Sequence, residues 1–130
     1  MTADDRLTEV FDRGLRDGPE SLSPTARELF SIQDFIIEYE MGGLSSYFYN
    51  RLPDLDRILA AVAAMRRHGM PELAALLGEA AELFAGYVEP VPPTTWNEIL
   101  RRYDPAGRLS ELHGPINALE NYGLGKSSIA

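Results

Sequence analysis

The 130-residue chain contains no cysteine. Disulfide bonds are therefore excluded, and so are redox or metal sites that depend on thiolate ligands. Long apolar runs are also missing, since none approaches the roughly 20 residues that a helix needs to cross a bilayer. The first residues, MTADDRLTEVFD, carry acids where a secretory signal has bases and an apolar stretch. We therefore expect a cytoplasmic protein with no membrane segment.

Histidine is scarce, and its two positions give little support to catalysis. His68 lies in a predicted turn before Gly69, and His113 precedes Gly114 at the end of a short predicted helix. Neither belongs to an H-E-x-x-H or H-x-x-x-H pattern, which would bring two ligands to one helical face. The sequence therefore predicts no metal and no organic cofactor.

Basic residues are outnumbered, with 12 lysines and arginines against 20 acids and a net charge of −8. Binding to DNA or RNA depends on neutralising phosphates with Lys and Arg, so this balance argues against direct nucleic-acid binding. No base occurs between Arg67 and Arg101. The glutamates of that segment are Glu72, Glu79, Glu82, Glu89 and Glu98. It is interpreted either as a solvated surface that aids solubility or as a docking face for a basic partner.

The stretch from residue 23 to residue 50, SPTARELFSIQDFIIEYEMGGLSSYFYN, predicts the helix around which the chain is organised. Its opening Ser-Pro pair is typical of a helix start. At 100° per residue, apolar side chains cover most of the circumference. The remaining narrow polar edge consists of Arg27, Ser31, Asp34 and Glu38. Gly42 and Gly43 then end the helix, because glycine adopts the left-handed conformation without a Cβ penalty, and residues 44–50 start a short second helix.

Amphipathic patterns predict further helices on both sides of this stretch. A first helix over residues 2–16 begins with a capping-box spacing. Its inward residues are predicted to be Leu7, Val10, Phe11 and Leu15. The next two helices, 52–67 and 71–84, are joined by so short a turn that they must be antiparallel neighbours. On the first of them, the inward residues are predicted to be Leu55, Ile58, Leu59, Val62 and Met65.

The last third of the chain is predicted to form a connector and several short helices. Residues 86–93 contain three prolines and favour an extended connector. A short helix follows over 95–103, and two more lie within 109–119, interrupted by Gly114-Pro115. No segment alternates with period two over a length that favours a strand. We expect an all-α fold, a single compact domain of six or seven helices over residues 1–122, with a flexible tail at 123–130.

Part of the central stretch resembles a known sequence signature, E-x-x-x-G-G-x-x-x-Y-F-x-N. The residues that carry it are Glu38, Gly42, Gly43, Tyr47, Phe48 and Asn50. This signature is similar to that of a bacterial helical domain family named after a DNA-mimic protein. The similarity is specific over residues 29–50 and continues as a looser pattern to about residue 84. It implies an all-helical fold and binding to a basic protein that otherwise binds DNA.

Four positions depart from the family pattern. Glu40-Met41 stands where the family usually has an Asn-Asn pair, Leu44 replaces an aromatic residue, and Ser46 replaces glutamine. The shared residues are of the kind that define a helix break and its packing. The resemblance therefore bears more strongly on the fold than on the activity.

The sequence thus predicts a non-enzymatic acidic interaction domain that mimics DNA and binds a basic protein partner. The candidate partner-binding residues are Asp34, Glu38, Glu79 and Glu82. A homodimer is left open. One alternative is a structural or immunity-type domain with another partner. The other is a small enzyme or accessory subunit whose carboxylates, Asp34, Glu38 or Glu40, share a metal or a proton.

Overall fold

Every regular element in the described part of the chain is helical. The computed structural model describes residues 2–52, 54–87 and 95–127. The elements in chain order are α1 (Ala3–Asp17), η1 (Pro19–Ser21), α2 (Pro24–Arg51), α3 (Leu55–Arg67), α4 (Pro71–Glu82), α5 (Trp96–Tyr103), α6 (Arg108–Asn117) and η2 (Glu120–Lys126), where η marks a 3-10 helix. The expected all-α fold is confirmed. No helix among these residues has the length and apolar character to cross a membrane.

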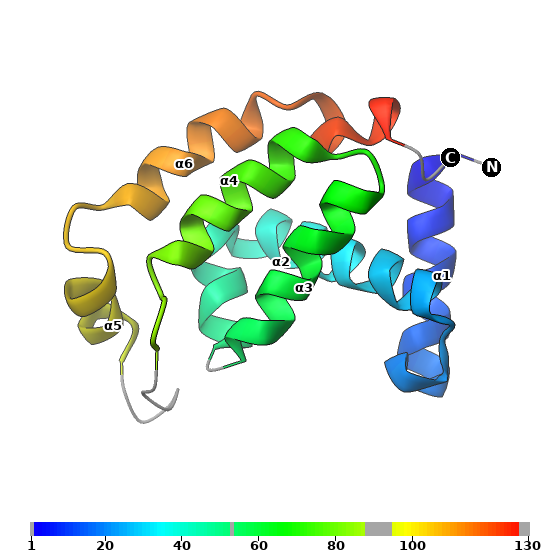
Figure 1. Ribbon diagram of the computed structural model, residues 1–130, viewed down its shortest axis with the longest axis horizontal. Coiled ribbons are helices and arrows are strands. Elements are labelled where there is room, and N and C mark those ends of the chain that lie inside the picture. The colour runs from blue at the N-terminus through cyan, green and yellow to red at the C-terminus, as the bar shows by residue number, and fades with distance from the viewer. Residues whose placement is uncertain (1, 53, 88–94, 128–130) are drawn as a thin grey trace.

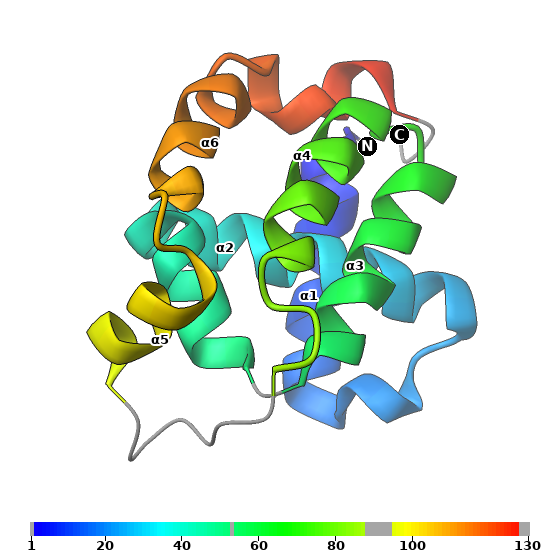
Figure 2. The same ribbon diagram turned by 60° about the vertical axis from the view of Figure 1, so that its left-hand side comes forward.

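Helix α2 lies at the centre, as its narrow polar edge predicted. Helices α1, α3 and α6 all pack against it. Figure 1 and Figure 2 show α3 and α4 side by side as an antiparallel pair, with α6 running along α4. Helices α1 and α5 lie at opposite ends of the long axis (Figure 1). The Ser23 side chain accepts a hydrogen bond from Ala26 N at 3.2 Å and caps α2 at the predicted start.

The predicted break at the glycine pair is confirmed. Element α2 consists of two helical halves joined by a kink, at which Gly42 and Gly43 both leave the helical conformation. Gly43 has φ +71° and ψ −161°, a combination that essentially only glycine adopts. A Cβ atom at this residue would lie 2.6 Å from Nε2 of His113. The turn therefore needs glycine both for its backbone angles and for the approach of α6.

The amphipathic pattern located α1 correctly but misplaced one residue. The capping box is present, with Asp5 N donating to Thr2 Oγ1 at 3.1 Å and Thr2 N donating to Asp5 Oδ2 at 3.3 Å. Leu15 is 65% exposed, so its predicted inward position is wrong. Gly14 is buried instead, and a Cβ there would lie 2.5 Å from the Phe30 ring. Close packing of α1 on α2 at Gly14 turns Leu15 outward.

Helix α3 shows a similar departure, because Leu59, predicted to face inward, is 46% exposed. Ile58, Val62 and Met65 fill the inward positions of this helix. Ile58 and Leu59 are adjacent in sequence, so their side chains lie about 100° apart around the helix. Ile58 points into the core, and Leu59 therefore points towards solvent.

The C-terminal elements differ from the expectation in continuity. Helix α6 runs through Pro115 without interruption, so the two short helices predicted around Gly114-Pro115 are one. Proline at residue 115 removes one backbone hydrogen-bond donor from the helix, but α6 stays helical to Asn117. Element η2 extends beyond residue 122, and Leu124 is buried. The predicted connector falls largely on residues 88–94, and the end of the predicted tail on 128–130, outside the described residues.

Candidate functional site

Asp34, the first candidate partner-binding residue, is buried and only 7% exposed. Both of its oxygens accept hydrogen bonds from Arg51, with Arg51 Nε to Asp34 Oδ2 at 2.7 Å and Arg51 Nη2 to Oδ1. Arg57 Nη2, on α3, lies 3.6 Å from Oδ2. The carboxylate therefore joins the two halves of α2 and ties them to α3, and it has little surface to offer a partner.

Glu38 lies one turn further along and bridges the same break. It accepts hydrogen bonds from Ser46 Oγ at 3.0 Å and from Asn50 Nδ2 at 2.8 Å. Arg51 Nη2 lies 3.4 Å from its second oxygen. Since all three donors belong to the second half of α2, Glu38 fixes the angle between the halves.

These contacts give a physical role to the sequence signature. Glu38 and Asn50 are its two ends and are bonded to each other across the turn. Gly43 provides the backbone conformation, while Tyr47 and Phe48 are buried in the core. The signature therefore encodes a clamped helix break.

The electrostatics of this clamp favour a fixed ion pair. Hydrogen bonding to Asp34 raises the pKa of the Arg51 guanidinium. Burial, followed by the nearby Asp34 charge, raises the pKa of Tyr47 far above its usual range. Arg51 thus stays charged and occupies both carboxylates, which a proton-transfer site would need free.

Glu40, the third carboxylate of the enzymatic alternative, does not join this cluster. It is exposed and accepts a hydrogen bond from Tyr122 Oη at 3.3 Å. Burial and the Glu40 charge raise the pKa of Tyr122 to about 12. In the part of the chain that the structure describes, no three His, Cys, Asp or Glu side chains are grouped to hold a metal ion.

The second candidate pair, on α4, lies at the surface. Glu79 is bonded to Arg108 Nε of α6, and Arg108 Nη1 also donates to Glu111 Oε2 at 2.8 Å. The hydrogen bond from Arg108 lowers the pKa of Glu79. The segment between Arg67 and Arg101 contains no Lys or Arg, but Arg108 of α6 lies against it in the folded chain. Glu82 is exposed and forms no ion pair within the described residues.

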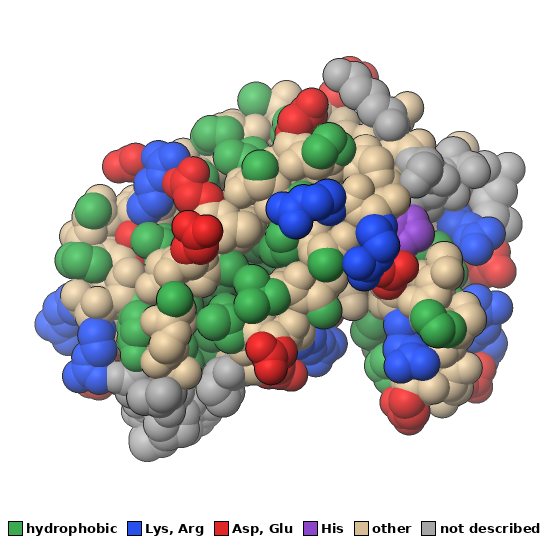
Figure 3. Space-filling model, viewed as in Figure 1, with side chains coloured by type: hydrophobic (Ala, Val, Ile, Leu, Met, Phe, Trp, Pro, Cys, Tyr) green, Lys and Arg blue, Asp and Glu red, His purple; other side chains and the backbone are tan. Residues whose placement is uncertain are grey.

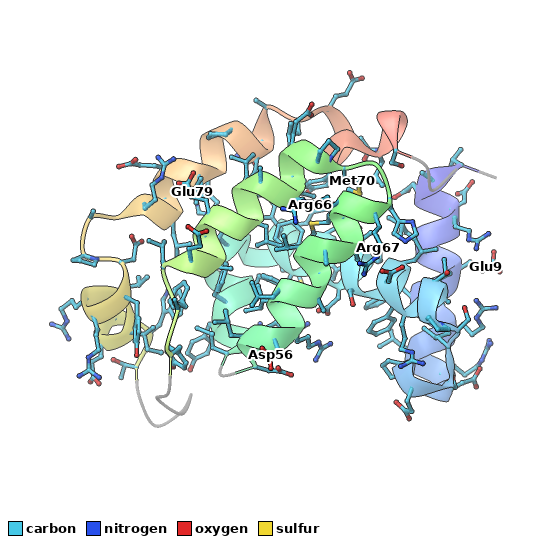
Figure 4. The ribbon with its side chains drawn as sticks, viewed as in Figure 1. Glu9, Asp56, Arg66, Arg67, Met70 and Glu79 are labelled. Atoms are coloured by element: carbon cyan, nitrogen blue, oxygen red, sulfur yellow. The ribbon has the colours of Figure 1, made fainter. Side chains whose placement is uncertain are left out.

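Glu79 and Glu82 belong to a larger group, which we call the α4–α6 acidic surface. Its members are Glu72, Glu79, Glu82 and Glu111. The three glutamates of α4 lie within about 80° of one another around the helix, at 100° per residue. Figure 3 shows red acidic side chains around a blue one over α4 and α6, and Figure 4 shows Glu79 on the side of α4 that faces α6. Sequence reasoning missed Glu111, although its spacing of three from Arg108 was a usable signal.

The other glutamates of the base-free segment do not extend this surface. Glu98 is exposed on α5, and Glu89 lies outside the described residues. Helix α1 carries a separate row of exposed acids. These are Asp5, Glu9 and Asp12.

Comparison with known proteins identifies the family. The model of the DMP19-like protein family, the family of DNA-mimic proteins, matches residues 20–123. The match spans well over half of the chain and includes both the clamped break and α4, so the chain belongs to this family. No curated protein and no solved structure gives a significant match.

Proposed function

We propose that this member of the DMP19-like protein family is a non-enzymatic acidic interaction domain that occupies the DNA-binding surface of a basic protein. Membership of a DNA-mimic family supports the partner class. The net charge of −8 supports attraction to a basic surface. The α4–α6 acidic surface is the observation that carries the proposal.

The distribution of ion pairs favours this surface over the acids of the central helix. Asp34 and Glu38 are engaged by Arg51, and only 10% and 16% of their side chains are exposed. Glu72 and Glu82 are exposed and form no ion pair among the described residues. Glu79 remains 43% exposed on its side chain even though Arg108 holds it. Binding would then use Glu72 and Glu82 as unpaired charges, and Glu79 and Glu111 as carboxylates that Arg108 holds in place.

The spacing of these charges suits a partner with well-separated cations. Glu72 and Glu79 are about 10 Å apart along the helix axis, and Glu79 and Glu82 about 4.5 Å. One strand of B-DNA carries a charge about every 3.4 Å, so the negative charges on α4 are more widely spaced than those of DNA. We therefore expect electrostatic steering to raise the association rate more than the final affinity.

The test is capture of a basic partner from the native lysate, followed by binding rates at two salt concentrations. The variant Glu72→Lys/Glu82→Lys leaves the Glu79–Arg108–Glu111 contacts intact and should slow association. The variant Glu9→Lys/Asp12→Lys makes the same change in net charge on α1 and serves as the matched control. Equal losses in both variants would assign binding to overall charge and contradict a role for the α4–α6 acidic surface.

The cytoplasm is the proposed location, because that is where a bacterial DNA-binding partner is found. A captured partner that is not basic and does not bind DNA would contradict the mimic and favour a structural or immunity-type domain. Association of two copies of this chain is the other proposed contact, and α3 offers a surface for it.

A further inference from the structure

Helix α3 carries an outer face that nothing in the described structure covers. The face consists of Asp56, Leu59, Ala60, Ala63 and Arg66. Leu59 is one of four large hydrophobic residues that are exposed in the described part of the chain, at 46%. Asp56 and Arg66 are exposed, and neither forms an ion pair among the residues described. Figure 4 shows Asp56 at one end of α3 and Arg66 towards the other.

The face is self-complementary when it is reversed. Asp56 and Arg66 lie five residues to either side of Ala61, and Leu59 and Ala63 lie two residues to either side. Two α3 helices can pack antiparallel about a two-fold axis that crosses them at the height of Ala61. Asp56 of each copy then lies opposite Arg66 of the other copy, which gives two such pairs. The same pairing places Leu59 against the small Ala63 of the second copy. An isologous contact requires this kind of match of one surface with itself.

The helix dipole explains only part of this arrangement. An acid in the first turn and a base in the last turn stabilise any helix, and α3 has Asp56 and Arg66 in those places. The dipole gives no reason for an exposed leucine between them. Alanines on the same face allow a second helix to approach closely. Figure 3 shows hydrophobic side chains gathered over α3 and α4 on this side of the molecule.

We infer that two copies of this chain associate through an antiparallel contact of α3 with α3. The charges favour a second copy of this chain as the partner. Asp56 at one end of the face and Arg66 at the other have opposite signs, so two reversed copies attract each other at both ends. This contact uses residues of α3 and none of the four glutamates of the α4–α6 acidic surface, and its test requires no other partner.

Sedimentation equilibrium over a range of protein concentrations tests the contact directly. The parent should form a dimer. Asp56→Arg or Arg66→Asp alone places like charges at both ends and should raise the dimer Kd about tenfold. The double variant Asp56→Arg/Arg66→Asp restores opposite charges and should recover the parent Kd. Arg101→Glu, an exposed change on α5, is the control and should leave the Kd unchanged.

A parent that stays monomeric at its highest soluble concentration would overturn the inference. So would a dimer whose Kd is the same in the parent and both single variants. Circular dichroism verifies that each variant remains helical, which is expected because both side chains are exposed.

A second measurement uses the absence of cysteine from the chain. In Ala60→Cys the introduced thiols would lie beside the two-fold axis, about 3 Å apart along the helix direction. Mild oxidation should link them into a covalent dimer much faster than in Ala85→Cys, where the thiol is exposed beyond the end of α4. Equal rates of cross-linking in the two variants would contradict the proposed axis.

Discussion

Nε2 of His113 accepts a hydrogen bond from the backbone N–H of Leu44 at 3.0 Å. Leu44 begins the second half of α2, where a helix has N–H groups without intrahelical partners. A side chain from α6, 69 residues away in sequence, therefore caps this half-helix. The bond requires Nε2 to be without a proton, so the other ring nitrogen carries it. Together Gly43 and His113 join α6 to the break in α2.

Replacing Gly43 tests the backbone requirement of this junction. Gly43→Ala should lower the free energy of unfolding by about 1–3 kcal/mol, because alanine is strained at this φ and ψ. The clash with His113 adds to this cost. Gly114→Ala is the control, since Gly114 does not have a positive φ and a Cβ atom there would point into open space. Denaturant midpoints give both values, and a midpoint for Gly43→Ala equal to that of the parent would contradict the assigned geometry.

Removing the imidazole tests the cap. His113→Ala should cost about 1 kcal/mol, the usual loss when a capping acceptor is removed. In the double variant Gly43→Ala/His113→Ala the clash disappears, so the combined cost should be smaller than the sum of the single costs. Strict additivity in this cycle would show that the ring does not restrict residue 43.

Arg51 is expected to be the most sensitive position of the clamp. Arg51→Ala leaves Asp34 buried without its main partner and should cost about 3–5 kcal/mol. Arg57→Ala removes a longer contact from a half-exposed arginine and should cost less than about 1 kcal/mol. Thermal and denaturant unfolding compare the two. Similar losses in both variants would mean that the bidentate contact is not what holds the break.

A pH titration of stability tests the contact between α2 and the end of α3. Burial opposes ionisation of Glu28, but hydrogen bonds from Arg67 and His68 hold the pKa of Glu28 below its ordinary value of 4.5. The unfolded state therefore binds this proton first as pH falls, and the stabilisation present above pH 4.5 is lost below it.

Glu28→Gln should accordingly reduce the loss of stability between neutral pH and acid. Glu98→Gln, at an exposed glutamate of α5 without an ion pair in the described region, is the matched control. If the two variants change the pH dependence equally, the contact of Glu28 contributes nothing specific.

Local patterns predicted much of the fold. The Thr2–Asp5 capping box, the Ser23 start and the glycine break all depend on residues close in sequence, and all are confirmed. Leu15 and Leu59 were misplaced because a period of 3.6 residues defines an apolar side without showing where a neighbouring helix ends. Pro115 was taken as a break because proline lacks the N–H that a helix interior uses, yet α6 continues through it.

The candidate site was less accessible to sequence reasoning, because it depends on contacts across the break. Asp34 lies on the polar edge of the helix and therefore looked solvated. Nothing in the sequence indicated that the turn at Gly43 brings Arg51 into contact with it. Glu79 likewise looked free of bases, because Arg108 approaches it only through the packing of α6 along α4. The contact between His113 and Leu44 has no signature in either segment.

Competition with DNA tests the central claim most directly. The protein is immobilised, the captured basic partner is bound to it, and duplex DNA is added at rising concentration while the retained partner is measured. Because mimic and DNA would occupy one surface of the partner, the DNA should release it progressively, and Glu72→Lys/Glu82→Lys should retain less partner even without DNA. Retention of the partner at saturating DNA, with parent and variant binding it equally, would contradict the account.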